Sequence, residues 1–154
     1  MKLLVINGPN LNLLGLREPA IYGSTTYAQL QDFIQDICAE EHITVEIKQS
    51  NHEGIIVDMV QEAYGNFDGI IMNPAAYTHT SVAILDALKS VGLPAVEVHI
   101  SNIFEREDFR HISYPSKACV KSFIGYGIEG YRKAILFLKD YINQNNKEKE
   151  AIKK

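Results

Sequence analysis

Short continuous apolar runs alternate along this chain with stretches whose apolar residues recur at helical spacing. Three runs have the composition of strands that are covered on both faces: Leu3 to Ile6, Gly69 to Met72 and Ala95 to Ile100. Between residues 43 and 48, apolar and polar side chains alternate, which predicts a half-exposed strand at a sheet edge. We expect a fifth strand around Ala118 to Ile124.

Four amphipathic stretches separate or follow these strands and predict helices. The apolar residues of each fall on one helical stripe: Leu30, Phe33, Ile34, Ile37 and Cys38; Ile55, Met59, Val60 and Ala63; Ile84, Leu85, Leu88 and Val91; Tyr131, Ala134, Ile135, Leu138 and Ile142. Alternating strands and helices are typical of a parallel sheet wrapped on both faces. We therefore expect a flavodoxin-like α/β three-layer sandwich with strand order 2-1-3-4-5, which would bind ligands beyond the carboxyl ends of its strands.

Length, composition and charge narrow the class of protein. A chain of 154 residues with 46% apolar content fits one domain, which we expect over residues 1–143, followed by a charged, frayed or disordered tail over residues 144–154. The apolar runs are too short to cross a membrane and no signal peptide opens the chain, which predicts a cytoplasmic protein. A formal charge of -4 with scattered Lys and Arg disfavours nucleic acid as a partner.

The connection after the first strand, residues 7–23, is unusually long for a strand-to-helix loop. It contains four leucines, which a solvated loop would not favour, together with Arg17 and Tyr22 as candidate functional groups. These residues favour a lid over a ligand site, whereas the Gly and Pro content fits a plain surface loop equally well. Both interpretations stay open on composition alone.

Polar residues also follow the fourth strand. Glu97 and His99 stand two positions apart and therefore point to the same side of the strand. A carboxylate beside an imidazole fixes its tautomer and stabilises its protonated form, which suits a general acid. A solvated strand end is the more common origin of such a pair. Arg106 and Arg110 come next, and each fits either a surface position or an anion clamp.

The third strand leads into Asn73, Pro74 and then His79 near the start of a helix. The helix dipole there disfavours a cation, so a neutral hydrogen-bonding role is more natural for His79. Asn73 by itself fits ordinary turn chemistry before proline. Neither the histidines nor the isolated cysteines, Cys38 and Cys119, show metal-ligand spacing, and no phosphate-binding loop is present, so metal and nucleotide chemistry are disfavoured.

Five segments taken together resemble the type II 3-dehydroquinate dehydratase family. In order along the chain they are NGPNLNLLG with Arg17 and Tyr22-Gly23, then QSNHEG, NPAAYTHTSVAILDAL, EVHISN and FRHIS. The resemblance implies a hydro-lyase without cofactor or metal that converts 3-dehydroquinate to 3-dehydroshikimate by anti elimination through an enolate. That reaction lies in the shikimate pathway to chorismate and the aromatic amino acids. The resemblance also implies a flavodoxin-like fold and a homododecamer built as a tetramer of trimers.

The resemblance further implies catalytic roles at matching positions. Tyr22 is similar to the base that removes the C2 proton, and Arg17 to the lid residue that favours its phenolate. His99 is similar to the acid that protonates the departing C1 hydroxyl, oriented by Glu97. Asn10 is similar to the residue that helps hold a water against the enolate oxygen.

Substrate binding is implied for a second set of residues. These are Asn73 and the backbone of Ile100 and Ser101 for the substrate carboxylate, His79 and Arg110 for the ring hydroxyls together with Asp86 from a neighbouring subunit, and Arg106 in the charged surround.

Two interpretations from other functional classes compete with this one. A flavodoxin-like binding module would hold FMN or a phosphate at the same strand ends, but Pro9 and four leucines stand where a Gly/Ser/Thr phosphate loop would be needed. The other is a non-catalytic interaction protein on the same fold. A colourless protein that forms a conjugated enone from 3-dehydroquinate would exclude both.

Overall fold

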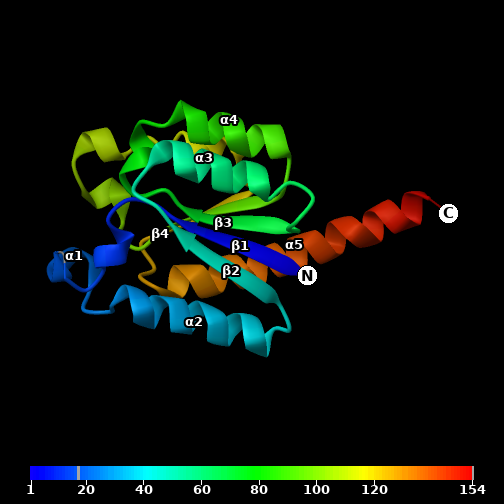
Figure 1. Cartoon of the computed structure of the whole chain (residues 1–154), viewed down its shortest axis with the longest axis horizontal. Helices are drawn as coiled ribbons and strands as arrows, with labels where there is room; N and C mark the ends of the chain where they lie inside the picture. Colours follow the sequence, from blue (N-terminus) through cyan, green and yellow to red (C-terminus); the bar gives the residue numbers. More distant parts are fainter. Residues whose placement is uncertain (17, 154) are drawn as a thin grey trace.

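Five parallel strands form a single sheet in the order β2-β1-β3-β4-β5 (Figure 1). The computed structural model describes residues 1–16 and 18–153, and of residue 22 the backbone only. The strands are β1 (Lys2–Asn7), β2 (Thr44–Gln49), β3 (Gly69–Asn73), β4 (Ala95–His99) and β5 (Lys121–Ile124). The predicted flavodoxin-like order, with the second strand at an edge, is confirmed.

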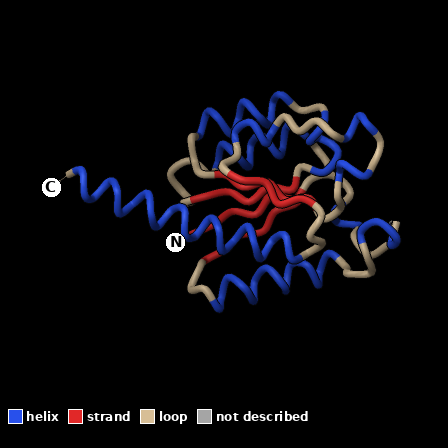
Figure 2. The backbone as a smooth tube through the Cα atoms, turned by 180° about the vertical axis from the view of Figure 1, so that it is seen from behind, coloured by secondary structure: helices blue, strands red, loops and turns tan. Residues whose placement is uncertain are grey.

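Helices cover both faces of the sheet, as Figures 1 and 2 show. The helices are α1 (Pro19–Tyr22), α2 (Tyr27–Glu40), α3 (Glu53–Glu62), α4 (Val82–Val91) and α5 (Glu129–Ile152). Leu3 and Val5 pack against α2 and α5, whereas Leu4 and Ile6 pack against α3 and α4. Because side chains alternate along a strand, every polar residue at a strand end is assigned to one of these two layers.

Three details of the predicted elements were wrong. β5 begins at Lys121, because the 3-10 turn Pro115–Ala118 occupies the start of the predicted strand. β4 ends at His99, so Ile100 lies in the following loop. In α3, Ile55 is 44% exposed and Ile56 is buried, since the stripe that faces the sheet runs through positions 56, 60 and 63.

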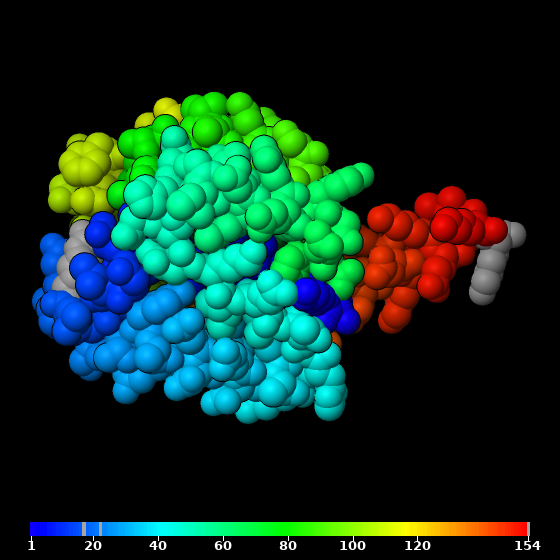
Figure 3. Space-filling model, viewed as in Figure 1, coloured from blue at the N-terminus to red at the C-terminus, as the bar shows by residue number. Residues whose placement is uncertain are grey.

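The last helix extends well beyond the sheet, at the end of the molecule opposite α1 (Figures 1 and 3). α5 continues to Ile152, through the segment expected to be a frayed or disordered tail. Its last turns hold alternating Lys and Glu, which are good helix formers, and Gln144 donates a 3.2 Å hydrogen bond to Glu148. The domain boundary at residue 143 stays a prediction.

None of the helices within the described residues has the length and apolar content that crossing a membrane would require.

Candidate active site

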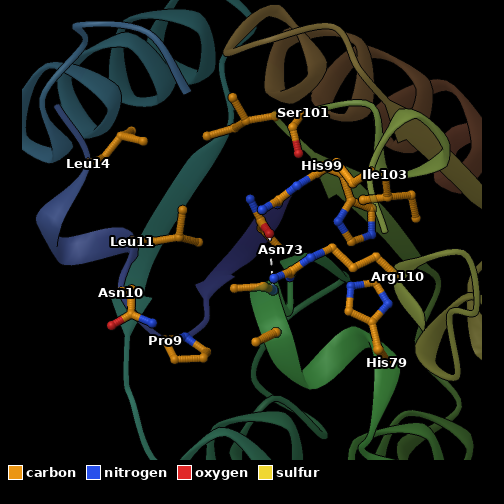
Figure 4. A pocket seen from close by; sticks show the side chains of 14 residues that line it. Pro9, Asn10, Leu11, Leu14, Asn73, His79, His99, Ser101, Ile103 and Arg110 are labelled. Atoms are coloured by element: carbon orange, nitrogen blue, oxygen red, sulfur yellow. Dashed lines mark hydrogen bonds between the residues drawn. The ribbon is translucent and has the colours of Figure 1, made fainter. Parts of the chain in front are cut away.

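The carboxyl ends of β1, β3 and β4 open into a pocket. It contains about 630 Å³ of empty space, counting its open mouth. Eight of the predicted site residues line it (Figure 4): Asn10, Asn73, His79, His99, Ile100, Ser101, Arg106 and Arg110. They come from the ends of β3 and β4 and from the loops that follow β1, β3 and β4, so the fold brings together residues that are distant in sequence.

The other four predicted residues have different positions. Glu97 is fully buried, and Asp86 is exposed on α4 and is not among the residues that line the pocket of its own chain. The backbone of Tyr22 ends α1, which lies at the end of the molecule opposite the C-terminus (Figure 1). Arg17 and the Tyr22 side chain lie outside the described residues.

The floor of the pocket depends on close contact between the ends of β1 and β3. Asn7 pairs with Asn73 in the sheet, and the Gly8 amide donates a 2.8 Å hydrogen bond to the Asn73 carbonyl. A Cβ atom on Gly8 would lie 2.4 Å from the Pro74 carbonyl oxygen, so the backbones approach this closely only because residue 8 is glycine.

Two residues that line the pocket have left-handed backbone conformations. Asn10 has a φ of 67°, and Ala75 has a φ of 52°. Asn tolerates this region better than most residues, whereas for Ala it costs roughly 1–2 kcal/mol. The backbone N–H of Asn10 donates a 2.9 Å hydrogen bond to Asn51 Oδ1. The backbone N–H of Ala75 donates a 3.2 Å hydrogen bond to Asn73 Oδ1. Side-chain hydrogen bonds therefore help fix both turns.

A buried carboxylate supports His99. Nε2 of His99 lies 3.0 Å from Oε1 of Glu97, although within the described part of the chain it forms no well-aligned hydrogen bond. The ring is thus placed beside the Glu97 carboxylate by the packing of the strand end more than by a directed N–H bond. Both side chains come from β4 and point to the same side of the sheet.

Two serines complete the environment of Glu97. Ser113 donates a 2.5 Å hydrogen bond to Oε1, and Ser122, which pairs with Glu97 in the sheet, donates a 3.0 Å bond to Oε2. Burial raises the pKa of Glu97, but the contact with His99 and the two serine hydroxyls outweigh it, so this pKa lies below its ordinary value. Glu97 is therefore a carboxylate under neutral conditions.

His79 is held in one tautomer at the side of the pocket. Its Nδ1 lies 2.8 Å from the Ile112 carbonyl oxygen, and a carbonyl only accepts, so Nδ1 carries the hydrogen. Burial lowers the pKa of His79 below its ordinary value, with further lowering by His99 and Arg110. The neutral ring is favoured, and its Nε2 is left as a hydrogen-bond acceptor.

The two arginines of the pocket share an acidic neighbour. Nε of Arg110 donates a 2.8 Å hydrogen bond to Oε2 of Glu107, and Nε of Arg106 lies 3.9 Å from the same oxygen. The hydrogen bond from the Glu107 backbone amide, followed by that from Arg110, lowers the pKa of Glu107. An ionised Glu107 thus restrains Arg110 at the pocket edge.

Sequence reasoning missed several supporting residues. Ser113, Ser122 and Glu107 each contact a predicted site residue, but their residue types carry no distinctive spacing. Ile112 and Ser113 do lie in the FRHIS segment, which is the one signal that could have found them. His111 is half-buried, and its Nε2 lies 3.0 Å from the Arg106 carbonyl.

Across the described residues, no group of three or more His, Cys, Asp or Glu side chains is arranged to hold a metal ion.

Comparison with known proteins gives a consistent result. Residues 1–139 match the family described as Dehydroquinase class II. The 3-dehydroquinate dehydratase of Clostridium acetobutylicum is 51% identical over 144 residues, which cover 94% of this chain and 100% of that protein. Catabolic 3-dehydroquinase 2 of Neosartorya fischeri is 56% identical over 133 residues, covering 86% of this chain and 89% of that protein.

A comparison with solved structures leads to the same family. The crystal structure of type II dehydroquinase from Butyrivibrio crossotus superposes with a TM-score of 0.89 at 55% identity, covering 90% of this chain and 97% of the other. The family match over residues 1–139 includes all five strands and all the residues that line the pocket. This chain therefore belongs to the class II dehydroquinase family.

Proposed function

We propose that this chain catalyses the dehydration of 3-dehydroquinate to 3-dehydroshikimate, a hydro-lyase reaction of the shikimate pathway that leads to chorismate. Membership of the family supports the reaction. The observation that carries the proposal is the pocket itself, which gathers an imidazole on a buried carboxylate, a neutral His79 and two arginines at one sheet end. These groups suit a small anionic ring that bears several hydroxyls.

The proposed chemistry begins with proton removal from C2, next to the ketone. Tyr22 serves as the base in its phenolate form, and Arg17 favours that form. A free phenol with a pKa near 10 is only about 0.1% ionised at pH 7, so a neighbouring cation is needed to raise the population of the base. The electron pair moves onto the ketone oxygen, and Asn10 helps hold a water against the resulting enolate.

Loss of water completes the reaction. The enolate re-forms the ketone, the C1–O bond breaks, and His99 gives its proton to the departing hydroxyl, which leaves as water. Glu97 stabilises the protonated imidazole from 3.0 Å. Anti elimination requires base and acid on opposite faces of the ring. Tyr22, in the connection after β1, and His99, at the end of β4, come from different segments and are suited to these two positions.

Substrate binding is proposed to use the remaining pocket residues. The substrate carboxylate would lie against the Asn73 amide and the backbone of Ile100 and Ser101. The ring hydroxyls would contact His79, whose Nε2 is an acceptor, and Arg110, a donor, with Arg106 adding positive charge. No cofactor or metal is included in this proposal.

We further propose that the active form is a homododecamer, a tetramer of trimers, in which Asp86 completes the site of a neighbour. The exposed position of Asp86 on α4, outside its own pocket, supports this division. Sedimentation of a fully active monomer would refute it. In mixed assemblies, an Asp86→Ala chain should weaken substrate binding in intact neighbouring subunits.

A cytoplasmic location is part of the proposal. Cys38 and Cys119 are free thiols, and burial raises the pKa of both. Unreactive free thiols fit a reducing compartment better than an oxidising one.

The decisive assay follows the ultraviolet absorbance of the conjugated enone when the purified protein meets 3-dehydroquinate. The sample should be colourless and should remain active with a chelator present. Substrate stereospecifically deuterated at C2 should lose the hydrogen anti to the departing hydroxyl.

A protein that binds FMN and leaves 3-dehydroquinate unchanged would refute the proposal in favour of a flavodoxin-like binding module. Loss of activity on treatment with borohydride and substrate would instead indicate a Schiff base on lysine.

A further inference from the structure

The hydroxyl of Tyr131 lies beneath the pocket, between two strand ends. Tyr131 is fully buried on α5. Its hydroxyl donates a 2.6 Å hydrogen bond to Asn7 Oδ1 and accepts a 3.1 Å bond from Asn73 Nδ2. This arrangement follows from the sheet, because Asn7 and Asn73 pair in register and point to the layer that α5 occupies.

The direction of these bonds is determined by the number of hydrogens. A phenol has one hydrogen to donate, and the short bond to Asn7 uses it. The hydroxyl can therefore only accept from Asn73, which must turn its NH₂ group toward Tyr131. The other end of the same amide agrees, because Asn73 Oδ1 accepts from the Ala75 backbone amide at 3.2 Å (Figure 4).

Burial raises the pKa of Tyr131 well above its ordinary value, so the hydroxyl keeps its hydrogen throughout the working range of pH. The network continues away from the pocket, where Asn7 Nδ2 lies 3.5 Å from the Tyr27 hydroxyl. Tyr27 contacts Asn7 alone in this network, whereas Tyr131 contacts both asparagines.

We infer that Tyr131 is a positioning residue for substrate binding: its hydroxyl holds the Asn73 amide with an N–H, and not the carbonyl oxygen, available to an anionic group in the pocket. One Nδ2 hydrogen is used by Tyr131, and the second remains for a ligand. A flipped amide would present its oxygen to the ligand and would repel a carboxylate. The inference rests on the proposed function only in naming that carboxylate as part of 3-dehydroquinate.

The test compares Tyr131→Phe, which keeps the ring and removes the hydroxyl, with wild type by steady-state kinetics on 3-dehydroquinate. KM should rise by about tenfold, the size expected when a hydrogen bond to a charged group is lost, while kcat changes by less than about twofold because carboxylate binding is equal in ground and transition states. Tyr27→Phe is the matched control, and its KM should equal that of wild type.

A double mutant separates positioning from general loosening. In an Asn73→Ala background, Tyr131→Phe should have no further effect on KM, because the group that it positions is gone. An unchanged KM in Tyr131→Phe with a lowered melting temperature would show a purely structural role and overturn the inference. So would equal KM increases with and without Asn73.

If Tyr131→Phe does not fold, Asn7→Ala provides the second test. It removes the acceptor that commits the Tyr131 hydrogen, so the hydroxyl becomes free to donate toward Asn73, and KM should again rise. An unchanged KM there would overturn the inference. Wild-type protein without any turnover would refute the proposed function, whereas an active wild type with an unaffected Tyr131→Phe variant would refute the positioning role alone.

Discussion

Oε1 of Glu97 lies 3.0 Å from Nε2 of His99, and both side chains are buried. A carboxylate at this distance in a partly desolvated site would stabilise the charge of His99 in its proposed role as the acid. Glu97→Gln keeps the shape of the side chain but removes that charge. We predict that kcat falls by about a hundredfold with a smaller change in KM. Glu46→Gln, which removes an exposed carboxylate of β2, is the control, and its kinetics should match wild type.

The same carboxylate should make stability depend on pH. The pKa of Glu97 is below its ordinary value of 4.5, so the unfolded chain binds this proton more tightly than the folded one. The contribution of Glu97 to the free energy of unfolding is therefore full above pH 4.5 and lost as pH falls through the folded pKa. Urea titrations above and below pH 4.5 should show a smaller acid loss in Glu97→Gln than in wild type. Equal losses would contradict the role of this buried group.

His79 should make the stability of the fold depend on pH in a second, higher range. Burial lowers its pKa below 6.5, His99 and Arg110 add to this, and the Ile112 carbonyl and Glu97 oppose it. Since the folded pKa is depressed, the stability that His79 contributes is present above pH 6.5 and is lost as pH falls through the folded value. In His79→Gln, the free energy of unfolding should change less with pH below pH 6.5 than it does in wild type. His52→Gln, an exposed change at the start of α3, should leave the slope as in wild type.

Tyr22→Phe tests the proposed base. The substitution deletes the phenol oxygen and keeps the aromatic ring, so turnover should be abolished while much of the affinity for 3-dehydroquinate remains. Isothermal titration of substrate with the inactive variant measures that affinity. Tyr64→Phe removes an exposed phenol and should have no effect. Near-normal kcat in Tyr22→Phe would refute the mechanism even within the correct family.

The fold was predictable because its strands have such uniform composition. β1 and β3 contain continuous apolar runs, and β4 is buried throughout although Glu97 and His99 interrupt its apolar residues. The alternating β2 fits an edge position. What failed was the start of β5, the end of β4 and the register within α3. Ile55 and Ile56 fit helical stripes one residue apart, and only packing against the sheet selects Ile56.

The place of a residue in the pocket was predictable where a ring side chain stands at or after a strand end, as with His99 and His79. The supporting groups were not, because their roles depend on contacts between distant positions. Tyr131 and Asn7 are separated by 124 positions, and the stripe of α5 accounts for Tyr131 as an ordinary core residue. Its hydroxyl acquires a role only when the sheet places two asparagines beside it.

Asn10 combines two roles that substitution can separate. Its backbone has a φ of 67°, which glycine adopts freely and alanine adopts at a cost of roughly 1–2 kcal/mol. Its side chain is proposed to help hold the water at the enolate oxygen. Asn10→Gly and Asn10→Ala both lack the amide, so both should lose kcat to the same extent. Only Asn10→Ala should carry the full backbone strain, and its melting temperature should lie roughly 2–4 °C or more below that of Asn10→Gly. Calorimetry and kinetics on the two variants measure these effects independently. If Asn10→Gly kept wild-type kcat, the residue would serve the turn alone, and another group would have to support the enolate.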